Sequence, residues 1–179
     1  MTTSSQTSEG ASAALLYDAL CEAGVTHVVT VPDFVQFALH EKLASADSAI
    51  TQVFACSEDQ ALTTATGLYV GGAVPVVLVQ NQGLYKCFNT LRAACIDAGA
   101  PIVFLVGQFG REPENFGQPM RQSRRSTVRL MEPFLEAVGL KYWTIDNDDD
   151  VAKVANAFAH AREAETAAIV LIGRNLIWN

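Results

Sequence analysis

The sequence has no surplus of positive charge. Its 179 residues hold 12 Lys and Arg against 19 Asp and Glu, a formal net charge of −7. Nucleic-acid binding depends on neutralising phosphates, so this balance argues against a nucleic-acid partner. Hydrophobic residues make up 50% of the chain and charged residues 17%, a balance that excludes a disordered chain and is typical of a globular one.

The sequence also lacks long apolar runs and a secretory leader. Its apolar runs are far shorter than the ~18 residues that suggest a membrane span, so we expect no membrane partner. Residues 1–10 are rich in Ser and Thr and have no basic start followed by an apolar segment, so they do not form a secretory signal. We interpret residues 1–11 as a disordered arm and residues 12–179 as a single cytoplasmic domain.

Several sequence motifs are absent as well. The four cysteines form no CxxC pair, and no His stands at metal-ligand spacing from them, so we expect free thiols in a reducing cytosol. No GxGxxG, GxxxxGKS/T or GxSxG segment occurs. These absences argue against the nucleotide cradles and the hydrolase nucleophile elbow that such motifs build.

The sequence does contain a regular alternation of apolar, β-rich runs with helical patterns. The predicted strands are residues 27–31, 50–55, 74–79, 101–106, 141–145 and 167–172. The predicted helices are residues 11–23, 34–43, 58–70, 84–98, 128–138 and 151–164; residues 146–150 cap the last helix, and residues 108–126 form a long loop. Apolar strands separated by helices indicate a mostly parallel sheet buried on both faces. We therefore predict an α/β, doubly wound, six-stranded fold with flavodoxin-like layering.

Polar residues gather directly after four of the predicted strands. These segments are Pro32–Phe34, Cys56–Glu58, Gln80–Gly83 and Gly107–Arg111. Ligands of such sheets bind beyond the carboxyl ends of the strands, so we expect these side chains to converge at one edge. A structural interpretation also stays open, with Asp33 and Ser57 as helix N-caps and with Asn81 and Gly83 as turn residues.

Four segments in a fixed order carry a resemblance to a known family. They are VPDF, CSEDQALTTATGLYVGG, VPVVLVQNQGLYKCFNTL and APIVFLVGQFGREPE. The sequence resembles the pyrimidine-binding domain of thiamine-diphosphate-dependent enzymes, above all the small (alpha) subunit of the sulfopyruvate and phosphonopyruvate decarboxylase group. The resemblance runs from about Ser12 to Gly173. Its most specific parts are the Glu after a strand that leads into a small-residue helix, and the QNxG turn after the next apolar strand.

The resemblance implies a defined role for Glu58. In this family, the Glu at that position hydrogen-bonds N1′ of the aminopyrimidine and so activates the cofactor ylid, which attacks the carbonyl group of a small 2-oxo acid that is then decarboxylated. A carboxyl group at the base of a cleft suits this proton exchange. The resemblance further implies a catalytic role in proton transfer for Asp33. It implies cofactor contacts for Pro32, Asn81, Gln82 and Gly83.

Substrate contacts are implied for Phe34, Gln82, Arg111 and Arg121. The sequence departs from the family pattern at two of these positions. Phe34 replaces the Ser of the usual PDS segment, which suggests an acid with a bulkier or less charged tail. Arg111 stands in GREP rather than RGEP. Arg121 begins the basic stretch 121–129, which is a candidate for binding an anionic substrate or facing a partner, or is simply a solvated loop.

The sequence contains no GDG motif, with which family members hold the diphosphate through Mg²⁺. We therefore expect no metal ligand in this chain. A second subunit with a GDG…N domain is expected to hold Mg²⁺ and the diphosphate, in a heterotetramer or larger assembly. Two alternatives stay open: a subunit of a thiamine-diphosphate-dependent carboligase or lyase, and a non-catalytic α/β binding or regulatory module.

Overall fold

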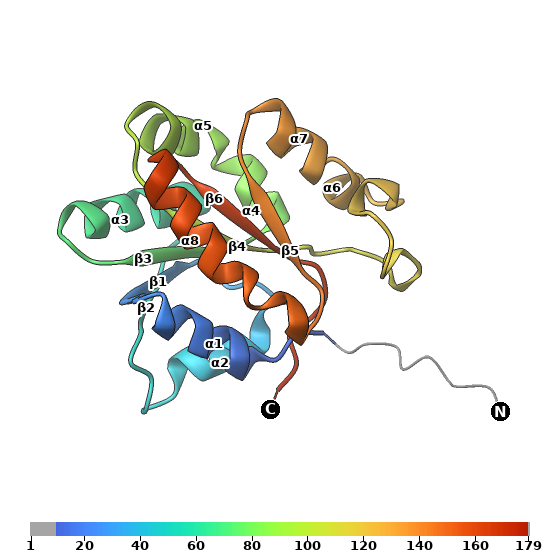
Figure 1. The fold of residues 1–179 in the computed structure, drawn as a ribbon, viewed down its shortest axis with the longest axis horizontal. Helices are drawn as coiled ribbons and strands as arrows, with labels where there is room; N and C mark the ends of the chain where they lie inside the picture. The colour runs from blue at the N-terminus through green and yellow to red at the C-terminus, as the bar shows by residue number, and fades with distance from the viewer. Residues whose placement is uncertain (1–9, 179) are drawn as a thin grey trace.

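The computed structural model describes residues 10–178. Within this range, six parallel strands form one sheet in the order β2-β1-β3-β4-β6-β5, which confirms the predicted doubly wound α/β fold (Figure 1). The strands are β1 (His27–Thr30), β2 (Thr51–Phe54), β3 (Pro75–Gln80), β4 (Val103–Gly107), β5 (Tyr142–Ile145) and β6 (Ala168–Ile172). The predicted arm, residues 1–11, lies outside the described residues except for its last two, of which Ala11 is buried.

Helices cover both faces of the sheet. One face carries α1 (Ala13–Glu22), α2 (Phe37–Ala44) and α8 (Lys153–Ala164). The other carries α3 (Glu58–Val70), α4 (Asn81–Lys86), α5 (Phe88–Leu91), the π-helix Arg92–Asp97, α6 (Ser126–Arg129) and α7 (Met131–Ala137). Figure 1 shows the two layers on either side of the strands.

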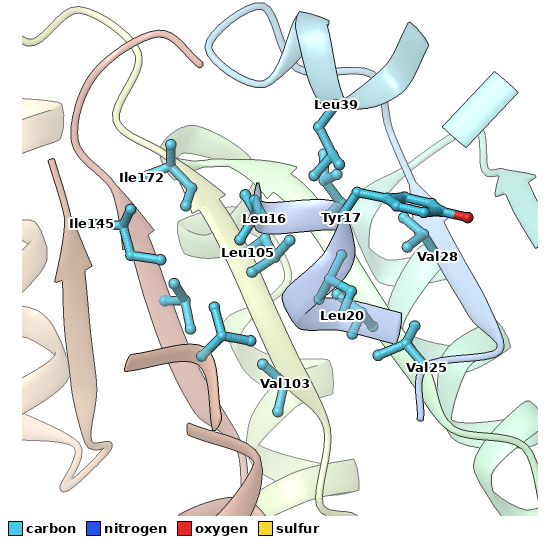
Figure 2. Packing of buried hydrophobic residues seen from close by; sticks show 14 of the residues in the cluster. Leu16, Tyr17, Leu20, Val25, Val28, Leu39, Val103, Leu105, Ile145 and Ile172 are labelled. Atoms are coloured by element: carbon cyan, nitrogen blue, oxygen red, sulfur yellow. The ribbon is translucent and has the colours of Figure 1, made fainter. Parts of the chain in front are cut away.

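The core consists of two apolar clusters, one on each face of the sheet. Side chains alternate along the central strands, so Val76 and Leu78 of β3 join one cluster while Val77 and Val79 join the other. Figure 2 shows Leu16 of α1 pointing toward the strands beside Leu105 of β4. Each such fully buried leucine contributes about 1.5–3 kcal/mol of hydrophobic stabilisation.

The predicted helix over residues 84–98 begins earlier than expected and is divided. Asn81 is its first residue, directly after β3, so the expected QNxG turn is instead the first turn of α4. The helical stretch then continues as α5 and the π-helix. Gly83 reads as a turn residue in the sequence, but its backbone is helical here.

Three other boundaries differ from the predictions. The helix expected from residue 34 begins at Phe37, which leaves Pro32 to Gln36 as a loop. The helix expected over residues 128–138 is split into α6 and α7, with Pro133 in the first turn of α7, where its missing N–H is tolerated. The acidic run forms a short 3₁₀ turn, Asp148–Asp150, capped by Asn147, and does not cap α8 directly.

The long loop after β4 is confirmed and contains two short 3₁₀ turns, Pro113–Asn115 and Met120–Gln122. Over the described part of the chain, every helix is too short or too polar to cross a bilayer.

Candidate functional site

The carboxyl ends of the strands bring the predicted site segments to one edge of the sheet. Strand β1 lies between β2 and β3, so the loops that carry Asp33, Glu58 and Asn81 follow three adjacent strands. The chain leaves β1 toward α2 on one face, and leaves β2 and β3 toward α3 and α4 on the opposite face. The edge between β1 and β3 is therefore a point at which the direction of winding reverses, and such points form crevices that bind ligands.

Glu58 is the first residue of α3, as predicted, and it is buried. The helix starts there because the Ser57 hydroxyl accepts a hydrogen bond from the backbone N–H of Gln60 at 3.3 Å. The Glu58 side chain lies against Gly83 of α4: a methyl group on Gly83 would stand 2.4 Å from Glu58 Cγ and 2.8 Å from Oε1. The absence of a side chain at Gly83 thus leaves the space that the Glu58 carboxylate occupies.

Lys86, one turn further along α4, is the ionic partner of Glu58. Its Nζ donates a hydrogen bond to Glu58 Oε2 at 3.0 Å. This hydrogen bond, together with the negative charge of Glu58, raises the pKa of Lys86. The Lys86 side chain is 54% exposed, whereas that of Glu58 is 11% exposed, so the lysine reaches the buried carboxylate from the solvent side.

Asp33 is a second buried carboxyl group at this edge. Its Oδ1 accepts a hydrogen bond from the backbone N–H of Val35 at 3.1 Å, and its Oδ2 accepts one from Gln36 Nε2 at 2.9 Å. Burial raises the pKa of Asp33, and the two hydrogen bonds oppose that shift. The carboxyl group also packs on the end of β4, where a methyl group on Gly107 would stand 1.7 Å from Oδ2.

His40 of α2 fixes the turn that carries Asp33. Its Nε2 accepts a hydrogen bond from the backbone N–H of Asp33 at 3.1 Å, and its Nδ1 lies 2.8 Å from the side-chain amide of Gln52 on β2. Because Nε2 accepts, the neutral ring carries its proton on Nδ1. The Gln52 atom that lies 2.8 Å from Nδ1 is the amide nitrogen Nε2. Burial lowers the pKa of His40 to about 4.

Acid should therefore destabilise the protein through His40. The unfolded chain has an ordinary His pKa of ~6.5, so this contribution is fully present above that pH and is lost as pH falls toward the folded value of about 4. From this residue we expect the free energy of unfolding to be about 2 kcal/mol lower at pH 5 than at pH 7. Urea unfolding of the wild type and of His40→Gln at both pH values measures the difference.

The glutamine variant keeps an acceptor for Asp33 but does not titrate, so its stability should fall less on acidification. Asp33 acts in the opposite sense, because a raised folded pKa favours the folded state as pH falls. That contribution is present in both proteins, and the comparison therefore isolates His40. Equal losses of stability in the two proteins would contradict the assignment.

The other residues predicted to contact the cofactor divide into two groups. Asn81 is fully buried, and its side chain forms hydrogen bonds within the protein. Its Nδ2 donates to the backbone oxygens of Phe109 at 3.0 Å and Thr127 at 3.4 Å. It thereby ties the start of α4 to the segment after β4. Pro32 and Gln82 are exposed at the same edge of the sheet.

Arg111 does not offer its guanidinium to a substrate in this structure. All five N–H groups have protein acceptors: the side chains of Asn115 and Asp146, and the backbone oxygens of Asn115, Gln118 and Gly173. The structure thus gives Arg111 a structural role, and its substrate contact stays a prediction. The shared acceptors bind the loop after β4 to the ends of β5 and β6.

Arg121 is likewise engaged within the protein. Its guanidinium pairs with Glu132 at 3.3 Å and with Glu136 at 2.7 Å, both on α7. The next basic residue of this stretch, Arg124, pairs with Glu114 at 3.2 Å. Arg121 and Arg124 thus form ion pairs on the surface, and substrate binding by this basic stretch stays a prediction.

The sequence did not single out Gln36, His40 or Lys86. His40 lies on the buried side of α2, and Gln36 is the buried residue directly before that helix. A single polar residue among the apolar ones is a weak signal in the sequence. Lys86 stands four residues after Gln82 on a helix that the sequence placed too late. In residues 10–178, no group of three or more His, Cys, Asp or Glu side chains is arranged to hold a metal ion.

The chain is similar in sequence to proteins that have a stated function. Two curated relatives are sulfopyruvate decarboxylase subunits alpha. The one from Methanothermobacter thermautotrophicus is 29% identical over 122 residues, which cover 66% of this chain and 73% of the relative. The one from Methanococcus maripaludis is 24% identical over 141 residues, which cover 78% and 80%.

Solved structures share the fold. Benzoylformate decarboxylase from Polynucleobacter necessarius aligns with a TM-score of 0.71 at 18% identity, over 92% of this chain. The 2-oxoglutarate:ferredoxin oxidoreductase from Magnetococcus marinus aligns with a TM-score of 0.67 at 12% identity, over 90% of this chain. The chain spans only 31% and 28%, respectively, of these two larger proteins.

The family model described as "Thiamine pyrophosphate enzyme, N-terminal TPP binding domain" matches residues 11–128. That range includes five of the eight helices labelled α and the four strands whose ends carry Asp33, Glu58, Asn81 and Gln108. The chain therefore belongs to the family of thiamine pyrophosphate enzymes, through their N-terminal cofactor-binding domain.

Proposed function

We propose that this chain is the pyrimidine-binding subunit of a heteromeric 2-oxo acid decarboxylase that uses thiamine diphosphate, the pyrophosphate of the family's name. The observation that carries the proposal is the position of Glu58. Its carboxylate is buried at the carboxyl edge of the sheet, in space left by Gly83 and beside the exposed cation of Lys86. Relatives named as decarboxylase subunits alpha support both the reaction class and a partner subunit.

The residues of this edge fit the pyrimidine half of the cofactor. Thiamine diphosphate supplies the electron sink for decarboxylation. Glu58 would hold a proton at its carboxyl oxygens next to the pyrimidine ring, and the exposed Pro32 and Gln82 would contact that ring. Asp33, with its raised pKa, would carry a proton near the substrate. The diphosphate and Mg²⁺ would be held by the partner subunit, in a cytoplasmic assembly suited to the four free cysteines.

The test is to purify the chain together with its partner subunit, add thiamine diphosphate and Mg²⁺, and screen 2-oxo acids for CO₂ release. We expect release that depends on the cofactor and on both subunits. Cofactor binding without CO₂ release from any acid would contradict decarboxylation and favour a carboligase, which uses the same cofactor chemistry to join carbon chains.

A further inference from the structure

A second crevice opens at the same edge of the sheet, between β4 and β6. After β4 the chain turns toward α6 and α7, whereas after β6 it turns to the opposite face, where Leu176 joins the cluster under α1 and α2. The direction of winding thus reverses here, as it does between β1 and β3. A cavity of about 550 Å³ lies at this point, lined in part by Gln108, Phe109, Arg111 and Gly173.

Three phenylalanines line this cavity. Phe34 comes from the loop after β1, and Phe109 and Phe116 come from the loop after β4. Phe34 is 69% exposed and Phe109 is 43% exposed, so a ligand that covered them would gain hydrophobic stabilisation. The guanidinium of Arg174 lies 4.5 Å from the centre of the Phe116 ring and so extends that wall.

The cavity adjoins the carboxyl group proposed to transfer a proton. Phe34 and Val35, which line it, directly follow Asp33 in the chain, and Asp33 packs on Gly107, the residue before Gln108. A molecule with its reacting group beside Asp33 can therefore place its tail between the phenylalanines. The cavity volume falls within the range of about 300–1,000 Å³ that is usual for small-molecule sites.

We infer that this cavity takes the tail of the substrate and that the substrate is a 2-oxo acid with an aromatic tail. The inference rests on the proposed function. A sulfonate tail presents three anionic oxygens and requires several N–H donors. Two cations line the cavity: Arg111 has all five N–H groups bound to protein oxygens, and the guanidinium of Arg174 lies against the face of the Phe116 ring. The three phenylalanines of the lining suit an apolar group instead.

The test compares three acids on the full chain: phenylpyruvate, pyruvate and sulfopyruvate. Binding to the chain alone is measured by calorimetry, because all described walls of the cavity belong to this chain. We expect phenylpyruvate to bind at least about tenfold more tightly than the other two, since burial of a ring contributes about 1.5–3 kcal/mol. Phe109→Ala should weaken phenylpyruvate about tenfold. Phe34→Ser should weaken it as well.

Phe37→Ala is the matched control. Phe37 is 48% exposed, lies three residues after Phe34 and packs on Trp178 outside the cavity, so its loss should leave binding within about twofold of the wild type. Equal binding of the three acids, or phenylpyruvate binding that Phe109→Ala does not weaken, would overturn the inference.

The assembled enzyme separates this inference from the proposed function. If it releases CO₂ from sulfopyruvate and not from phenylpyruvate, the inference of an aromatic substrate tail is refuted. The proposed decarboxylase activity is then still supported. If no acid is decarboxylated but phenylpyruvate binds and Phe109→Ala weakens that binding, the assignment of the cavity is supported. The proposed decarboxylase activity is then refuted. Release of CO₂ from phenylpyruvate that Phe109→Ala slows supports both.

Discussion

Glu58→Gln is expected to lower CO₂ release by the assembled enzyme at least about 100-fold, the scale of general acid–base catalysis by a positioned side chain. Glutamine keeps the length of the side chain and its hydrogen-bonding atoms, but it cannot gain or lose a proton there. The change therefore removes proton exchange with the pyrimidine ring and little else. Turnover with saturating thiamine diphosphate, together with cofactor affinity, measures the effect.

Folding should survive this substitution. Within residues 10–178, the ionic partner of Glu58 is Lys86, whose side chain is 54% exposed and stays hydrated once the carboxylate is gone. Because Lys86 is exposed to water, its ion pair with Glu58 contributes little to stability. Thermal unfolding and co-purification with the partner subunit should therefore match the wild type.

Asp59→Asn is the matched control for Glu58. Asp59 is the next residue of α3, also an acid, and its Oδ1 accepts a hydrogen bond from the Thr90 hydroxyl at 2.8 Å. We expect its turnover to stay within a few-fold of the wild type. Wild-type turnover in an assembled Glu58→Gln enzyme would refute the role of Glu58 and favour a non-catalytic binding module.

Gly83→Ala perturbs the same carboxylate from the other side. Alanine favours helices by about 1 kcal/mol over glycine, so α4 itself should tolerate it. The added methyl group, however, would stand 2.4 Å from Glu58 Cγ and must displace that side chain. Lower turnover with normal assembly would show that Gly83 positions Glu58, a role distinct from the cofactor contact that the sequence predicted.

Local signals explain why the placement of Glu58 was predictable. An apolar strand, a serine cap and a small-residue helix follow one another within a short stretch, and each of them acts through its immediate neighbours. The start of α4 was mispredicted because a glycine in this position is typical of a turn. In the structure Gly83 is helical, and its missing side chain leaves room for the side chain of Glu58. No local pattern could show that need, since it comes from a residue 25 positions earlier in the chain.

The same limit applies to the buried polar residues. Gln36 donates to Asp33 and to the backbone oxygens of Val79 and Leu105, on two strands far along the chain. The sequence shows only a glutamine near the start of a helix. Partners of this kind are set by the order of strands in the sheet, which is a tertiary property.

The role of Arg111 depends on contacts that only the tertiary structure reveals. Of the substitutions proposed for this chain, Arg111→Ala should lower the free energy of unfolding the most. Arg111→Ala leaves Asp146 without its cation and deprives the backbone oxygens of Asn115, Gln118 and Gly173 of a donor. Removing one partner of a buried ion pair costs about 3–5 kcal/mol, and we expect a loss of that size in the free energy of unfolding. Urea unfolding at neutral pH measures it.

Two further variants show whether geometry or charge carries this effect. Arg111→Lys keeps the charge but offers three donors without the planar fork, so it should recover only part of the loss. Arg121→Ala removes an arginine whose side chain is 50% exposed and pairs with two glutamates, and it should cost no more than about 1 kcal/mol. If Arg111→Ala were as mild as Arg121→Ala, the loop would hold without its guanidinium, and the predicted substrate contact would regain support. Gly173 argues against that outcome, because a methyl group there would stand 1.9 Å from Asp146 Oδ1 and 2.4 Å from an Arg111 nitrogen, so the chain leaves room at this point for the ion pair.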